Sequence, residues 1–250
     1  MMPVDDALRA LDARLRDSDY FPYYRAHRAR YRSDALRVLG TMGDGPVLEV
    51  GSVPCHATAL LALCGVPVVG VDVAPERAQA TIDAFGLDVR RCDIERGPLP
   101  FADAHFSTVL FAETFEHLRV DPQFVLSELN RVLTPGGTLL LTTPNLYSAQ
   151  NIARFLAGRG ITDGLSEFSK LRTVGHMGHV REYAPAEVRR FLEASGFAIE
   201  RVDFAHYHYR PGKRGMLARV VFAVLPRRFR SFQVVTARKI RPGPGLAPLG

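Results

Sequence analysis

The stretch that decides the expected fold is VLEVGSVPCHATALLALCGVPVVGVDV, residues 47–73. Two apolar runs, 46–51 and 66–73, enclose a segment with helical spacing at 57–65, and the first run ends at Gly51. An apolar strand, a glycine turn, a helix and a second apolar strand are typical of a parallel sheet covered on both faces. Asp72 lies about twenty residues past the turn, where nucleotide-binding α/β folds place a ribose-binding carboxylate. A tight turn followed by a strand-end acid, with no ligand, would explain the same letters.

The alternation of strands and helices continues along the chain. Further strands are expected at 87–94, 106–113, 138–145, 198–204 and 232–239, and helices at 74–86, 121–137 and 184–197. Asp121 is the expected cap of the middle helix, and Pro-Gly-Gly is its expected stop. The pattern predicts an α/β fold with a doubly wound, seven-stranded, mostly parallel sheet. Because no crossover helix joins the last two strands, we also expect an antiparallel edge strand.

We expect one domain over residues 1–240. Residues 1–44 are predicted to be an N-terminal helical lid, which includes an aromatic and basic segment at 20–32. Residues 146–182 and 205–231 interrupt the alternation, and long insertions in a compact domain are usually functional. We therefore predict that both form a cap over the substrate. Residues 241–250 are rich in Pro and Gly and are expected to be disordered.

Composition and charge narrow the class of protein. With 47% hydrophobic and 23% charged residues, the chain has an ordinary globular composition. Three cysteines without CxxC spacing argue against a disulfide framework or a zinc ribbon and for a reducing compartment. The acidic start and the lack of any run approaching about 20 apolar residues predict a cytoplasmic protein. A net charge of +6 is small for gripping RNA, so nucleic acid is not the expected partner.

Four segments carry a family resemblance: LEVGS, VVGVDVAPE, RCDIERGPLPFADAHFSTVLFAETFEHL and LNRVLTPGGTLLLTTPN. In this order and at these intervals they resemble the class I S-adenosylmethionine-dependent methyltransferases, over residues 45–204 with a returning strand at 232–239. The resemblance implies a Rossmann-like methyltransferase fold and S-adenosylmethionine as the cofactor. A dinucleotide-binding dehydrogenase is the nearest rival. A P-loop is excluded because no Gly-Lys-Ser/Thr follows the turn.

The resemblance also implies the residues that bind the cofactor. Glu49 and Gly51 would hold its methionine part, Asp72 its ribose, and Asp93 its adenine amino group. Glu113 would lie beside the methyl donor. The complete expected set is Glu49, Gly51, Ser52, Asp72, Val73, Asp93, Ile94 and Glu113.

One departure concerns the first turn, which usually reads Gly-x-Gly-x-Gly in the family and here reads GSVPC, residues 51–55. Two glycines that permit close backbone approach are missing. Either Ser52 and the altered turn still fit the cofactor, or the protein is a non-catalytic, methyltransferase-like binding subunit. We predict retained binding, because Glu49, Asp72 and Asp93 are all present.

A second pattern follows the fourth expected strand, where Glu113, Glu116 and His117 have the spacing E-x-x-E-H. This spacing resembles metal-dependent O-methyltransferases of ubiquinone biosynthesis and those that act on the 2′-hydroxyl of small-RNA ends. In the RNA enzymes a later histidine completes the site, and here 175–183 offers His176 and His179. The resemblance implies Mg²⁺ or Mn²⁺ on these five residues, with Glu116 and the three histidines in catalysis. Metal-free methyltransferases also carry Glu-His-Leu here, as a substrate wall.

The chemistry of such a site suits an alcohol acceptor. A divalent ion that chelates neighbouring hydroxyls lowers the pKa of the hydroxyl that attacks, and a histidine can take its proton. We predict an O-methyltransferase for a sugar, glycan or related polyhydroxylated small molecule. A catechol or quinone precursor is the second candidate, and an RNA 2′-hydroxyl the third.

Residues 211–231 contain an apolar stretch between basic clusters. This combination suits an interfacial helix at an anionic membrane, on its inner face. It suits a homodimer interface or a packed helix equally. If the stretch lies on a membrane, a lipid-linked saccharide becomes an attractive acceptor.

Overall fold

The computed structural model describes residues 1–174, 178–207, 222 and 224–249. Seven strands form one sheet in the order β3-β2-β1-β4-β5-β7-β6. All seven expected strands are present: β1 Val47–Val50, β2 Val68–Asp72, β3 Asp88–Arg91, β4 Phe106–Ala112, β5 Leu133–Pro144, β6 Phe197–Ala205 and β7 Phe232–Lys239. The predicted doubly wound, mostly parallel sheet is confirmed.

The antiparallel strand of the sheet is β7, which pairs antiparallel with β5 on one side and with β6 on the other. β7 therefore lies one place in from the edge, and β6 is the edge strand. The chain therefore runs along β7 in the direction opposite to that of β5 and β6. In the antiparallel pairing of β5 with β7, Leu141 lies opposite Val235.

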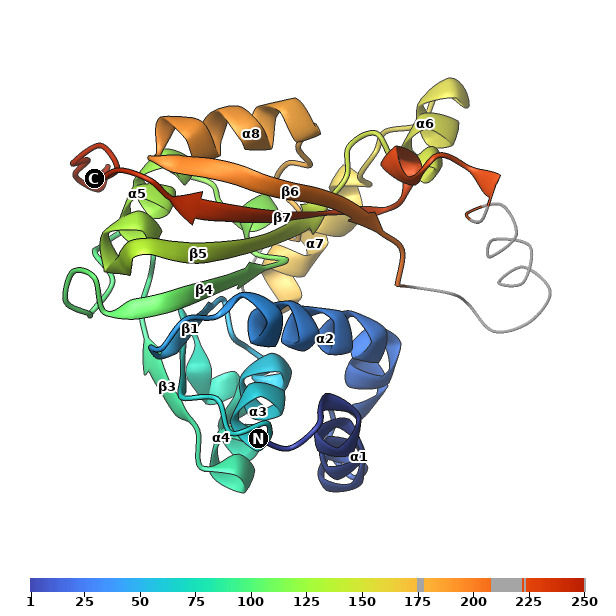
Figure 1. Ribbon diagram of the computed structural model, residues 1–250. Helices are drawn as coiled ribbons and strands as arrows, with labels where there is room; N and C mark the ends of the chain where they lie inside the picture. The colour runs from blue at the N-terminus through green and yellow to red at the C-terminus, as the bar shows by residue number, and fades with distance from the viewer. Residues whose placement is uncertain (175–177, 208–221, 223, 250) are drawn as a thin grey trace.

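Helices cover both faces of the sheet (Figure 1). α5 (Pro122–Val132) and α8 (Pro185–Ala194) pack on one face, where Phe124, Leu129 and Leu192 are fully buried or nearly so. α1 (Val4–Leu15), α2 (Phe21–Thr41) and α3 (His56–Leu63) pack on the other. Two short elements, η1 (Pro75–Ala78) and α4 (Gln79–Phe85), link β2 to β3.

The N-terminal segment contributes to the core. The tyrosine Tyr24 is fully buried, and its hydroxyl donates to Asp12 at 2.6 Å, which joins α2 to α1. Leu8 and Leu11 of α1 are also fully buried. A movement of residues 1–44 as a lid stays a prediction.

The expected cap of α5 is present: Asp121 accepts hydrogen bonds from the amides of Gln123 and Phe124 at 2.9 and 3.2 Å. The helix ends at Val132, two residues short of the predicted Pro-Gly-Gly stop, which begins at Pro135, and β5 already begins at Leu133. Residues that precede a proline are disfavoured in the helical conformation, so Pro135 ends the helix upstream of itself.

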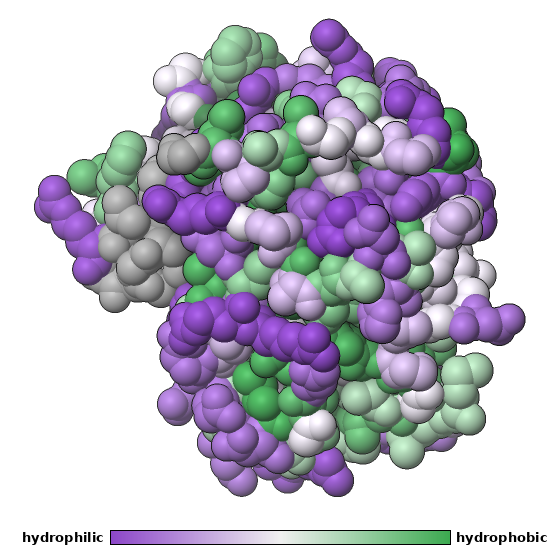
Figure 2. Space-filling view, turned by 90° about the vertical axis from the view of Figure 1, so that its left-hand side faces the viewer, coloured by the Kyte–Doolittle hydropathy of each residue, from purple (hydrophilic) through white to green (hydrophobic). Residues whose placement is uncertain are grey.

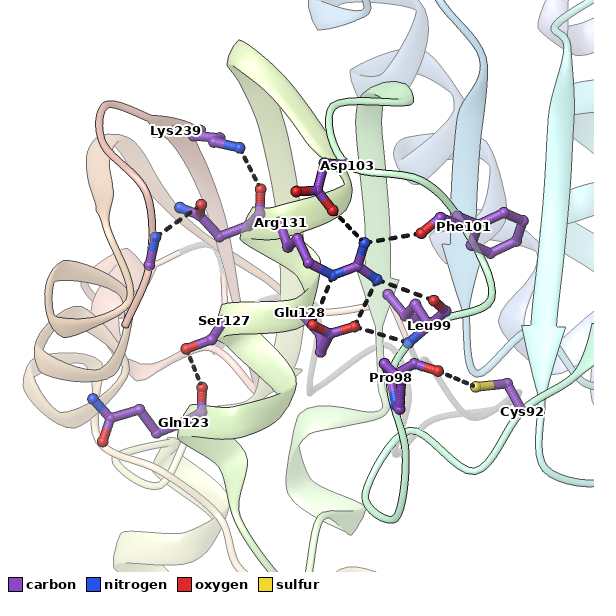
Figure 3. Close-up of polar contacts among 12 residues, drawn as sticks. Cys92, Pro98, Leu99, Phe101, Asp103, Gln123, Ser127, Glu128, Arg131 and Lys239 are labelled. Carbon is purple, nitrogen blue, oxygen red and sulfur yellow. Dashed lines mark hydrogen bonds and ion pairs between the residues drawn. The ribbon is translucent and has the colours of Figure 1, made fainter. Parts of the chain in front are cut away.

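The segment between β3 and β4 is tied to α5 by a fork of polar contacts (Figure 3). Arg131 donates to the carbonyls of Leu99 and Phe101 at 3.0 and 2.9 Å and to Asp103 at 2.7 Å. Glu128 pairs with Arg131 at 2.8 Å and accepts the amide of Leu99 at 2.8 Å. These contacts hold in place the segment that carries Asp93.

The first insertion contains α6 (Ala149–Leu156) and α7 (Gly164–Val174), and the second contains η3 (Arg227–Phe229). A short helix, η2 (Phe115–His117), follows β4. Most of the predicted interfacial stretch 211–231 lies outside the described residues. Within the described part of the chain, no helix has the length and apolarity needed to cross a membrane. Residues 241–249 form no helix or strand, but Asn130 bonds the carbonyl of Arg241 and the amide of Gly243, both at 3.1 Å.

Candidate active site

A cavity of about 820 Å³ opens at the carboxyl ends of β1, β2 and β4. Six of the eight predicted cofactor residues line it: Gly51, Asp72, Val73, Asp93, Ile94 and Glu113. Glu49 and Ser52 lie behind this wall, with 6% and 2% of their surface exposed. They do not line the cavity, and their contact with the cofactor stays a prediction.

The altered turn keeps the backbone shape that glycines would give. Gly51 has φ +73°, and a Cβ there would lie 2.2 Å from the Thr114 hydroxyl oxygen. Cys55, at the position of the third family glycine, also has positive φ, at +66°. The amides of Gly51 and Ser52 both donate to the Val71 carbonyl, at 2.9 and 3.1 Å. Two of the three positions that are glycine in the family thus have positive φ here, one of them at a cysteine, where that conformation is strained.

Two carboxylates hold the turn from either side. Asp72 accepts from the amides of Val53 at 3.0 Å and Ala74 at 2.9 Å, which joins the end of β2 to the turn. Glu49 accepts from the Thr58 hydroxyl and so joins β1 to α3. Burial raises the pKa of Glu49 to about 7. Asp72 lies at the cavity wall, where its carboxylate can accept from ribose hydroxyls.

Glu116 is the centre of the second predicted pattern and has no exposed surface. Its Oε2 accepts from the Thr143 hydroxyl at 2.9 Å, whereas its Oε1 has no hydrogen-bond partner among the described residues. The Nε2 atoms of His117 and His179 face this oxygen at 3.9 and 4.0 Å. Burial, together with nearby carboxylates, raises the pKa of Glu116.

Backbone hydrogen bonds bring His179 close to His117, although the two residues are 62 positions apart in the sequence. The Glu116 carbonyl accepts from the amides of Val180 and Arg181 at 2.9 and 3.2 Å, so the segment after α7 is laid against η2. The rings of His117 and His179 then meet edge to face, with centroids 5.2 Å apart. Glu116, His117 and His179 have candidate ligand atoms within 4.8 Å of one another.

The other nitrogen of each ring faces an oxygen atom, within hydrogen-bond distance for His117 and slightly beyond it for His179. His117 Nδ1 lies 2.9 Å from the Gly178 carbonyl, which can only accept, so Nδ1 carries the proton. His179 Nδ1 lies 3.6 Å from Glu182, and Glu182 in turn accepts from Asn151 at 2.6 Å. Histidine ligands of metals typically have their second nitrogen held by a carbonyl or carboxylate in this way.

Of the other two predicted metal ligands, only Glu113 is among the described residues, and it is not part of this cluster. Glu113 lines the cavity with φ +53° and accepts from the Thr142 hydroxyl at 3.1 Å, but it is outside the three-residue group. Burial and the charge of Glu116 raise the pKa of Glu113. His176 lies outside the described residues.

Four residues of the site or its surroundings were not predicted from the sequence. Thr114 follows β4 and lines the cavity, Thr143 lies near the end of β5, and Asn151 and Glu182 lie in an insertion without periodicity. Only Glu182 had a signal, since it lies three positions after His179. Tyr20 and Tyr23 of the predicted lid do line the cavity, and His27 stacks on Tyr23 with ring centroids 4.1 Å apart.

Comparison with known proteins identifies the family and the fold. Residues 48–141 match the family model described as a methyltransferase domain. A Mycolicibacterium smegmatis protein named as a probable S-adenosylmethionine-dependent methyltransferase is 33% identical over 71% of this chain and 60% of its own length. The demethylmenaquinone methyltransferase of Thermus thermophilus is 40% identical over 31% of this chain and 36% of its own. A Haloferax volcanii protein solved in complex with the Trm112 methyltransferase activator has the same fold, with a TM-score of 0.59, 19% identity and coverage of 92% and 98%.

The chain belongs to the class I S-adenosylmethionine-dependent methyltransferases. It spans 60% of the length of the Mycolicibacterium relative and about a third of the Thermus enzyme.

Proposed function

We propose that this protein is an O-methyltransferase that transfers the methyl group of S-adenosylmethionine to a hydroxyl of a sugar, glycan or related polyhydroxylated small molecule, with a divalent cation such as Mg²⁺ or Mn²⁺ at Glu116, His117 and His179. The observation that supports it most is the Oε1 atom of Glu116. A fully buried carboxylate oxygen without a hydrogen bond is costly. A cation shared with two imidazole nitrogens would remove that cost.

The cofactor would occupy the part of the same cavity that is lined by Gly51, Asp72 and Asp93. Asp72 and Asp93 supply carboxylates at and just after the ends of β2 and β3. When bound, the cofactor supplies an activated methyl group. The acceptor would then lie between this part of the cavity and the Glu116 cluster, opposite Tyr20 and Tyr23.

The residues of the cavity would have separate roles in methyl transfer. Glu116, His117 and His179 would hold the cation, which lowers the pKa of a bound hydroxyl. The new bond joins the hydroxyl oxygen to the methyl carbon, the sulfur–carbon bond breaks, and the hydroxyl proton must leave. Glu113 lines the cavity outside the cluster, and its raised pKa suits a group that takes up a proton near neutral pH.

The test uses calorimetry and activity together. S-adenosylhomocysteine should bind the purified protein, and Mn²⁺ should bind with one site that Glu116→Gln weakens. Methylation of a panel of polyhydroxylated acceptors should fall on chelation with EDTA and return with added Mn²⁺. If EDTA leaves the methylation activity unchanged, the proposed requirement for a metal ion is refuted. Failure to bind the cofactor product at millimolar concentration would favour the non-catalytic binding subunit.

A catechol or quinone precursor is the second candidate acceptor. Tyr20, Tyr23 and Phe232 line the cavity and can stack on a flat ring. The Thermus relative is a demethylmenaquinone methyltransferase. The same panel should therefore contain catechols, and a preference for them over sugars would decide between the two classes. Homodimer formation and membrane contact through 211–231 stay predictions.

A further inference from the structure

The helix α6 has its polar side turned inward and its apolar side turned outward. Asn151 is 8% exposed and donates to Glu182. Ile152, Phe155 and Leu156 are exposed at 37, 73 and 80%. A surface helix of a globular protein normally shows the opposite arrangement, with its apolar stripe on the core.

The next helix, α7, is exposed along most of its described length. Leu165 and Phe168, three positions apart, are exposed at 81 and 60%, and only Glu167 is largely covered, with its side chain 15% exposed. Lys170 lines the cavity. Single exposed apolar residues need no explanation, but large apolar side chains exposed on two consecutive helices mark an interaction surface.

A third element, η3, lies beside α6 (Figure 1). The link is Asn145, whose side chain donates to the carbonyls of Arg228 and Arg230 at 2.8 and 2.9 Å, while its own carbonyl accepts from Asn151 at 3.3 Å. Val224, just before η3, is 81% exposed. We call α6, α7, η3 and Val224 the docking face. The C-terminal side of the molecule, seen in Figure 2, instead carries polar and apolar residues interspersed.

Charge indicates what this face contacts. Residues 205–250 contain ten Lys and Arg and no Asp or Glu, whereas residues 1–204 contain 22 basic and 26 acidic residues. On the described face, Arg227 and Arg228 are exposed beside the apolar positions, as is Arg159 just after α6. Apolar side chains flanked by cations are the composition of elements that rest on anionic membranes.

We propose that α6, α7 and η3 dock on the surface of an anionic lipid bilayer, with Phe155, Leu156, Leu165 and Phe168 in the headgroup region and Arg227 and Arg228 against lipid phosphates. This contact does not depend on methyl transfer. Since Lys170 and Phe232 line the cavity, docking places the cavity next to the membrane surface.

The experiment sediments the full chain with vesicles of phosphatidylcholine alone or mixed with phosphatidylglycerol. Binding should require the anionic lipid and weaken with salt. Phe155→Ser with Leu156→Ser, and separately Arg227→Ser with Arg228→Ser, should each weaken vesicle binding about tenfold or more. The matched controls are Ile240→Ser, 63% exposed at the C-terminal end, and Arg189→Ser with Arg190→Ser on α8.

The controls should bind vesicles as the unaltered protein does, and all variants should bind S-adenosylhomocysteine with unchanged affinity, which separates this contact from the proposed function. The proposal is overturned if the unaltered protein ignores anionic vesicles, or if the Phe155 and Leu156 variant binds them equally well. Light scattering provides the third outcome. A dimer in lipid-free solution that this variant dissociates would mean that a second copy covers the face, and the proposal would fall.

Discussion

The buried carboxyl of Glu49 should make this protein less stable as pH rises through neutrality. Burial raises its pKa from 4.5 to about 7 in the folded chain. Between these two values the folded state binds more protons than the unfolded state, so the free energy of unfolding falls as pH increases. A difference of about 2.5 pKa units corresponds to about 3 kcal/mol of the free energy of unfolding. This contribution is fully present below pH 4.5 and is lost above pH 7.

Glu49→Gln tests this magnitude, because a glutamine can still accept from Thr58 but carries no charge. The quantity of interest is the free energy of unfolding of the variant minus that of the unaltered protein. We expect this difference to be about 3 kcal/mol larger at pH 8.5 than at pH 5. The assay is urea unfolding of the ligand-free protein at both pH values. Other buried acids titrate in both proteins, so their contributions cancel in the comparison. Glu200→Gln, a change of a partly exposed carboxylate on β6, is the control. An identical pH dependence with and without Glu49 would refute the reasoning.

Three further predictions follow from the same contacts. Gly51→Ala should lower the free energy of unfolding by more than about 2 kcal/mol and abolish S-adenosylhomocysteine binding, because its Cβ would collide with Thr114. The control is Gly86, which has a similar φ but where an added Cβ would meet nothing within 4 Å. Gly86→Ala should lower the free energy of unfolding by only about 1 kcal/mol, measured by thermal unfolding. Glu182→Gln should weaken Mn²⁺ binding about tenfold or more in calorimetry while cofactor binding is kept; equal Mn²⁺ affinity would argue against an orienting role. Arg131→Met should lower the free energy of unfolding, measured in urea, by about 2–4 kcal/mol, because it leaves Glu128 and two carbonyls without their cation. A loss below about 0.5 kcal/mol would show that the contacts of Arg131 do not stabilise the fold.

Local patterns were sufficient for the elements of the fold. The apolar runs that became β1, β2 and β4 have the length and composition of buried parallel strands, and Asp121 caps α5 where expected. These features depend on neighbours a few positions apart, which a sequence displays directly. The place of β7 inside the sheet does not, because it depends on which strand the returning chain meets.

The candidate site divides in the same way. The sequence by itself determined the turn at Gly51, the acids Asp72 and Asp93 at strand ends, and the pair Glu116 and His117, since each is local in the chain. Only the tertiary structure showed that His179 lies beside them. His179 meets Glu116 because backbone amides of the later segment bond the Glu116 carbonyl. It also decided that Glu113 stands apart from the cluster and that Glu49 lies behind the cavity wall. Contacts between distant segments depend on how the chain packs in three dimensions, and spacing along the sequence does not record that packing.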